Sequence, residues 1–138
     1  MVLAENQKIK ISSKAENIIL VEKMIEDVCD VFNISEDYYG NILVALTEAV
    51  NNAIYHGNQA NPNKNIEIYF KSHPTYVSFI VKDEGKGFNY DSLPDPTNPE
   101  NIEKPNGRGV FLMKNLADKV TFEDNGSKVI LDFNISSN

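Results

Sequence analysis

Residues 43–57 read LVALTEAVNNAIYHG, and the interpretation of the whole chain starts from this stretch. Its apolar residues recur every three or four positions, which predicts a helix over residues 38–55 with one buried face. Two polar residues, Glu48 and Asn52, interrupt the apolar pattern, and their i, i+4 spacing puts both side chains on the same side of the helix. The pattern leaves two interpretations open. The polar stripe either faces water, or lines a cleft in which the Asn52 oxygen binds a hard cation and Glu48 accepts a proton.

The segments around this helix predict an α/β protein in which helices group against a largely antiparallel sheet. Apolar residues at helical spacing predict two more helices, over residues 17–32 and 110–117. Alternating polar and apolar residues predict strands over residues 7–12, 66–70 and 77–81, and two final strands flank a turn signal at residues 124–126. The expected order is therefore β-α-α-β-β-loop-α-β-β. The length of 138 residues suits one domain, residues 1–138.

The composition argues against several classes of protein. Thirteen Lys and Arg against twenty Asp and Glu give a net charge of −7, whereas direct binding to nucleic acid or to an anionic membrane needs a positive surface. No apolar run approaches the roughly 20 residues that span a bilayer, and the first residues lack the pattern of a secretory signal. Cys29 is the single cysteine and can form no internal disulfide. We therefore expect a reduced, cytoplasmic protein.

Two Gly-x-Gly elements lie on either side of a long segment with little periodicity. Gly85 and Gly87 follow a predicted strand, and Gly107 and Gly109 precede the third predicted helix. Glycine lets a backbone pass close to a ligand, although either pair alone is also what a simple turn requires. The segment between them, residues 89–106, holds four of the six prolines, and a long loop of this kind tends to be functional or mobile.

Asp83 and Arg108 add chemistry to these two glycine elements. Asp83 ends the strand before the first pair, where its carboxylate could accept a hydrogen bond from an exocyclic amine and so select adenine. The second pair leads into a helix, whose first N–H groups are unpaired and carry partial positive charge, which favours a phosphate. Arg108 adds a cation at the same place. Together these features predict a nucleotide pocket.

Three segments, in this order, resemble the N, G1 and G2 boxes of the histidine-kinase-like (GHKL) ATPase superfamily: residues 48–57, 83–88 and 107–113. Within that superfamily the chain is most similar to the short anti-sigma-factor serine-protein kinases of the RsbW-like family. The resemblance covers about residues 40–131. It implies the Bergerat ATP-binding fold, a two-layer α+β sandwich with about three helices on one face of the sheet and a mobile lid over the ATP.

The resemblance also implies a role for each motif residue. Asn52 would coordinate the Mg²⁺ that bridges the ATP phosphates, and Asp83 would bind the adenine amino group. Glu48 would be the general base that draws the proton from a substrate serine. The remaining nucleotide-binding positions would be Gly85, Gly87, Gly107, Arg108, Gly109 and Ser127.

Two functions of different classes are compatible with these residues. The first is a Mg-ATP-dependent kinase that phosphorylates a serine or threonine on a small anti-sigma-factor antagonist of the STAS type, with sequestration of a sigma factor as a second activity. The second is a sequestering switch that binds nucleotide without useful turnover; Glu48 favours the kinase, because sequestration has no use for a base. A two-component histidine kinase fragment is disfavoured, since neither His56 nor His73 lies on a helix preceding the domain. Apolar residues near the first strand and helix could form a homodimer, as in the resembled family.

Overall fold

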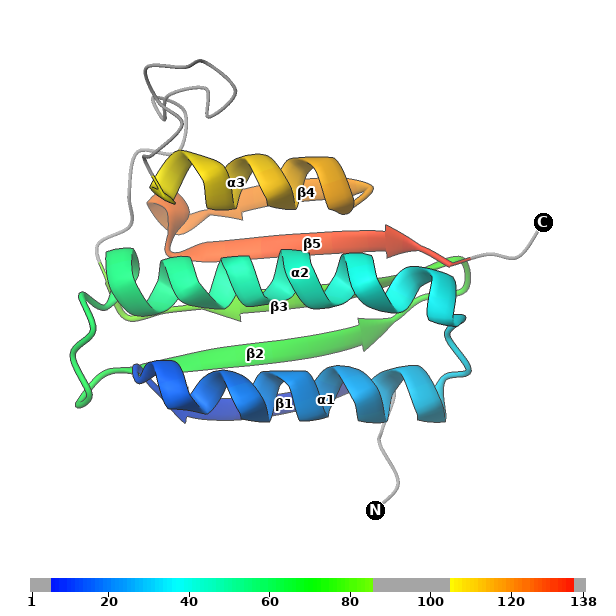
Figure 1. Ribbon diagram of the computed structural model, residues 1–138, viewed down its shortest axis with the longest axis horizontal. Coiled ribbons are helices and arrows are strands. Elements are labelled where there is room, and N and C mark those ends of the chain that lie inside the picture. Colours follow the sequence, from blue (N-terminus) through cyan, green and yellow to red (C-terminus); the bar gives the residue numbers. More distant parts are fainter. Residues whose placement is uncertain (1–5, 86–104, 136–138) are drawn as a thin grey trace.

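The computed structural model of the chain describes residues 6–85 and 105–135 (Figure 1). The strands are β1 (Asn6–Ser12), β2 (Asn65–Ser72), β3 (Tyr76–Lys82), β4 (Lys119–Glu123) and β5 (Lys128–Asn134). The helices are α1 (Ile18–Val31), α2 (Glu36–Asn52) and α3 (Pro105–Leu116). The predicted order of elements is confirmed.

The strands form one five-stranded sheet in the order β1-β2-β3-β5-β4, and every neighbouring pair is antiparallel. The three helices lie side by side across one face of this sheet (Figure 1). The α+β fold with a helical layer on a largely antiparallel sheet is therefore confirmed, and in the described residues the sheet is antiparallel throughout.

The core lies between the sheet and the helical layer because both contribute an apolar surface. On β2, alternate residues Ile66, Ile68 and Phe70 are buried at 0% exposure, as expected for a strand with one face against a core. On α1 the buried residues recur at helical spacing. They are Val21, Met24, Ile25 and Val28. α2 lies in the middle of the layer and contacts β3, β5 and α3, which places its polar stripe beside α3.

The ends of α2 are set by its sequence. Ser35 caps the first turn by accepting a hydrogen bond from Asp37 N at 3.2 Å, as serine commonly does at the start of a helix. The end of the helix differs from the prediction, which placed it at residue 55. Regular α-helix ends at Asn52, and a π turn follows over Ala53–Gly57. A π turn inserts one extra residue into the helical spiral, and such turns often occur at functional sites.

α3 begins earlier than expected, at Pro105 instead of position 110. Proline suits the first position of a helix, since its missing N–H would be unpaired there anyway. As a consequence, Gly107 and Gly109 lie in the first turns of the helix and do not precede it. The predicted mobile loop over residues 89–106 lies outside the described residues, apart from the last two, which belong to α3.

The described helices include none that is long and apolar enough to cross a membrane.

Candidate functional site

The polar stripe of α2 faces the first turns of α3. A β-carbon built on Gly109 would lie 3.1 Å from Glu48 Oε2 and 3.3 Å from Asn52 Oδ1, so both side chains lie directly against the helix backbone at this glycine. Asn52 is only 9% exposed, and its Nδ2 has no hydrogen-bond partner among the described residues. Of the two interpretations of the stripe, the structure therefore favours the one in which it lines a cleft.

An unpaired amide nitrogen in a buried position carries a desolvation penalty of about 1–3 kcal/mol. Proteins rarely leave such a group without a partner, and a ligand can provide one. The orphaned Nδ2 of Asn52 therefore marks a position where a polar ligand group would be stabilising. Glu48 is half-buried and makes no hydrogen bond or ion pair within the described part of the chain.

Asp83 follows β3 and lies at the other side of the site. Its carboxylate is buried, with 8% of the residue exposed, and its Oδ1 accepts a hydrogen bond from Gly85 N at 2.7 Å. Burial raises the pKa of Asp83 from 3.8 to about 6, against the opposing effects of the Gly85 N–H and the charge of Lys64. The backbone N–H of Asp83 donates to Ser127 O at 2.9 Å, which ties this segment to the start of β5.

The π turn at the end of α2 packs against the segment after β3. A β-carbon on Gly57 would overlap the carboxylate of Asp83, and one on Gly85 would overlap the carbonyl of Gly57. Gly85 therefore excludes any larger residue, because its backbone lies against the backbone of Gly57, and a larger residue at Gly57 would displace the Asp83 carboxylate. This contact brings the end of the first predicted motif, residues 48–57, directly against the beginning of the second, residues 83–88.

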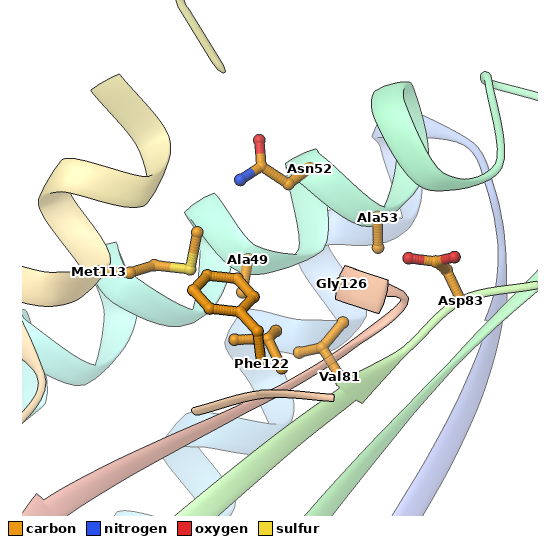
Figure 2. Close-up of a pocket in the computed structure, with 9 residues that line it drawn as sticks. Ala49, Asn52, Ala53, Val81, Asp83, Met113, Phe122 and Gly126 are labelled. Atoms are coloured by element: carbon orange, nitrogen blue, oxygen red, sulfur yellow. The ribbon is translucent and has the colours of Figure 1, made fainter. Parts of the chain in front are cut away.

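A single pocket combines these elements, and Figure 2 shows its lining. Asn52 from α2 and Asp83 from the end of β3 supply polar groups, while Met113 from α3 and Phe122 from β4 supply apolar surface (Figure 2). The full lining is Ala49, Asn52, Ala53, Val81, Asp83, Met113, Phe122, Gly126 and Val129. These residues enclose about 10 Å³, roughly the room that one water needs, so a larger ligand must extend beyond the enclosed space.

The structure describes only some of the other predicted site residues. Gly107 and Arg108 lie in the first turn of α3, and the Arg108 side chain lies outside the described part of the structure. Gly87 lies outside the described residues altogether. Ser127 is next to the pocket, but its hydroxyl donates to Asp124 O at 2.9 Å and its carbonyl accepts from Asp83 N. A direct contact between the Ser127 hydroxyl and a nucleotide remains a prediction.

Sequence reasoning missed the apolar part of the pocket. Met113 lies four residues after Gly109, so helical spacing alone would have placed it on the same face of α3. Phe122 gave no comparable signal, because its position depends on the pairing of β4 with β5, where it lies opposite Val129. Gly126 is part of the 124–126 turn, and no local pattern indicates that this turn reaches the pocket.

A metal at this site would depend on few protein ligands. No group of three or more His, Cys, Asp or Glu side chains in residues 6–85 and 105–135 is arranged to hold a metal ion. Mg²⁺ commonly keeps several waters and takes only one or two protein oxygens together with substrate phosphates. Within the described residues, a buried carboxamide with an unpaired nitrogen lies beside a carboxylate without a partner, and this pair fits a Mg²⁺–phosphate group better than a metal cage built from protein alone.

Comparisons with known proteins give the same family as the motifs. Residues 11–133 match the model of the histidine kinase-like ATPase domain. The serine-protein kinases RsbW of Staphylococcus aureus strains JH9 and Newman are each 28% identical over 121 residues, which cover 83% of this chain and 76% of theirs.

A solved structure also shares the fold. It contains the RsbU and RsbW domains of Rv1364c from Mycobacterium tuberculosis, and it superposes with a TM-score of 0.63 at 14% identity. The match covers 96% of this chain and 33% of that one, so the chain spans about a third of the larger protein. The family match extends over nearly the whole chain, and it includes the residues that line the pocket. The chain belongs to the histidine kinase-like ATPase domain family.

Proposed function

We propose that this protein is a Mg-ATP-dependent serine/threonine protein kinase of the anti-sigma-factor type. The observation that carries the proposal is the convergence of Glu48 and Asn52 on Gly109 in the first turns of α3, with Asn52 also lining the pocket that holds Asp83. A base, a metal-binding amide oxygen and a helix N-terminus would supply the positioning and charge neutralisation that phosphoryl transfer needs, and a buried carboxylate would select adenine. The similarity to serine-protein kinases supports the same conclusion.

ATP would lie across the crevice with its two ends at different elements. The ionised Asp83 carboxylate would accept a hydrogen bond from the adenine amino group, and Gly85 and Gly87, which have no side chains, would let the backbone pass close to the flat ring. The phosphates would lie at the first turn of α3, where unpaired N–H groups favour negative charge. Gly107, Gly109 and Arg108 would contact them there, and Gly87 and Ser127 complete the proposed nucleotide-binding residues.

Asn52 would hold the metal through its Oδ1, and its Nδ2 would gain the partner that it lacks in the described residues. Mg²⁺, when bound, neutralises charge on the transferring phosphoryl group. Glu48 would accept the proton from a substrate hydroxyl as that oxygen bonds to the γ-phosphorus. The bond between the γ-phosphorus and the β,γ-bridging oxygen breaks, and ADP leaves. Glu48 is suited to this task since no described residue competes for its carboxylate.

The expected protein substrate is a small anti-sigma-factor antagonist of the STAS type, and a sigma factor is the second expected partner. A second copy of the chain is the third expected partner, and β1 together with α1 is the surface that we propose for this contact. β1 is an edge strand, and beside it an apolar groove of about 420 Å³ runs along α1. Leu20, which is 49% exposed, lines this groove. An exposed edge strand next to apolar surface is a common pairing site.

The alternative function is a nucleotide-dependent switch that sequesters a partner without turnover. A variant of Glu48 distinguishes the kinase from the switch, because only the kinase needs a base. The test adds γ-labelled ATP and Mg²⁺ to a lysate of the native organism together with wild-type protein or Glu48→Gln. We expect a labelled phosphoserine or phosphothreonine on a small protein with the wild type and none with Glu48→Gln. Exposed Glu22 on α1 supplies the control, because Glu22→Gln should transfer label normally. Equal transfer by Glu48→Gln would reject Glu48 as the base.

A pull-down from the same lysate distinguishes the alternative. A partner that is retained with ATP and never labelled would favour the sequestering switch. A partner that is labelled and then released would favour the kinase.

A further inference from the structure

The residue after the π turn, Asn58, is fully buried, with 0% of its surface exposed, and every polar group of its side chain is engaged. Its Oδ1 accepts a hydrogen bond from Glu84 N at 2.8 Å. Its Nδ2 donates to Ser13 Oγ at 2.8 Å and to Asn65 O at 3.0 Å. One carboxamide therefore joins three segments: the end of β1, the start of β2 and the segment after β3.

The bond to Glu84 matters most for the site because Glu84 lies between Asp83 and Gly85. On the β5 side, this segment is held by Asp83 N donating to Ser127 O. Within the segment, Gly85 N donates to Asp83 Oδ1. On the α2 side, Asn58 accepts from Glu84 N. The carboxylate of Asp83 is therefore held between β5 and the end of α2, and Asn58 makes the hydrogen bond on the α2 side.

The chemistry of the position calls for an amide. A side chain here must accept from one backbone N–H and donate to two oxygens, and only Asn or Gln has one acceptor and two donors on one short planar group. Asn58 also directly follows Gly57, whose backbone packs against Asp83. Loss of the amide would leave the Glu84 N–H without its acceptor, and the segment would then be free to shift away from α2.

We propose that Asn58 is a positioning residue for nucleotide selection: it fixes the segment 83–85 against the end of α2, and thereby sets where the Asp83 carboxylate meets the base. This inference rests on the proposed binding of ATP and extends it to a residue outside the three motifs. Asn58 itself, enclosed by protein, does not touch the nucleotide.

The test compares ATP and GTP binding by isothermal titration in wild type, Asn58→Ala and a matched control. Asn17 is the control, since its Nδ2 also makes two hydrogen bonds, to Ser12 O and Ser12 Oγ, but at the corner between β1 and α1. In Asn58→Ala we expect ATP affinity to fall about tenfold and GTP affinity to change little, so that the preference for ATP shrinks. Asn17→Ala should keep the wild-type ratio even if it unfolds more easily.

Hydrogen exchange at the Glu84 amide gives a readout that does not depend on nucleotide. It should be faster in Asn58→Ala than in wild type and unchanged in Asn17→Ala, because only the first variant removes its acceptor. If Asn58→Ala does not fold, Asn58→Ser carries the test, since its hydroxyl is too short to reach Glu84 N and Asn65 O together.

A folded Asn58 variant with the wild-type ratio of ATP to GTP affinity, or with unchanged exchange at Glu84, would overturn the inference. A wild-type protein that binds no ATP would refute the proposed function itself, and this inference with it.

Discussion

Replacing Asp83 by Asn should stabilise the fold while it damages the proposed adenine site. Burial raises the pKa of the carboxyl from 3.8 to about 6, so the folded protein resists the charged form. At about 1.4 kcal/mol for each pH unit, this rise corresponds to at most about 3 kcal/mol of lost stability at neutral and higher pH. Asparagine has nearly the same shape, can still accept from Gly85 N and carries no charge.

The sign of the pH dependence follows from the raised pKa. Between about pH 4 and pH 6 the folded protein holds a proton on Asp83 that the unfolded chain has released. The contribution of this group to stability is therefore full below about pH 4 and is lost as the pH rises through about 6. Asp83→Asn lacks this loss. Its advantage over wild type should be close to zero at pH 4 and should reach about 1–3 kcal/mol at pH 8.

Urea unfolding followed by far-ultraviolet circular dichroism at pH 4, 6 and 8 measures this difference. Asp30, an exposed residue of α1, supplies the control: Asp30→Asn should change the unfolding free energy by less than about 0.5 kcal/mol at each pH. The same Asp83→Asn protein should discriminate less between ATP and GTP. An Asp83→Asn variant that is no more stable than wild type at pH 8 would refute the reasoning from burial.

Three further variants test other contacts of the site and the proposed dimer. Gly57→Ala should reduce ATP affinity at least tenfold in titration calorimetry, because its new methyl group overlaps the Asp83 carboxylate. The control Gly40→Ala has nothing within 4 Å of its new methyl group, so it should bind ATP normally and gain about 0.5–1 kcal/mol of stability. Equal ATP binding by the two variants would contradict the packing argument. Lys64→Met should raise the pKa of Asp83 further, so in titration calorimetry the loss of ATP binding on acidification should begin at a higher pH than in wild type, and an unchanged profile would exclude this charge effect. Leu20→Glu should give a monomer in sedimentation equilibrium if the groove beside β1 binds a second copy; a wild-type monomer would rule out that dimer.

Much of the fold could be predicted because each element carries its own local signal. The alternation in β2 and β3 and the apolar spacing in α1 and α2 are each contained within one segment. The predicted start of α3 at residue 110 was wrong, because Gly107 and Gly109 favour a loop when they are considered in isolation. The packing of α3 against α2 outweighs that local preference.

The site was predictable only in part, for a related reason. The i, i+4 spacing of Glu48 and Asn52 defines a shared direction, and the structure places both against Gly109. The contact between Gly57 and Asp83 depends on a π turn, which no local pattern announces. Asn58 looks like an ordinary loop residue in the sequence, since its partners lie far from it along the chain.

The claim that α2, α3 and the end of β3 together form a Mg-ATP site is tested most directly by isothermal titration of Mg-ATP into wild type, Glu48→Gln and Asn52→Ala. The account predicts that wild type and Glu48→Gln bind alike and that Asn52→Ala shows no binding. Wild-type affinity in Asn52→Ala, or no binding by the wild-type protein, would contradict it.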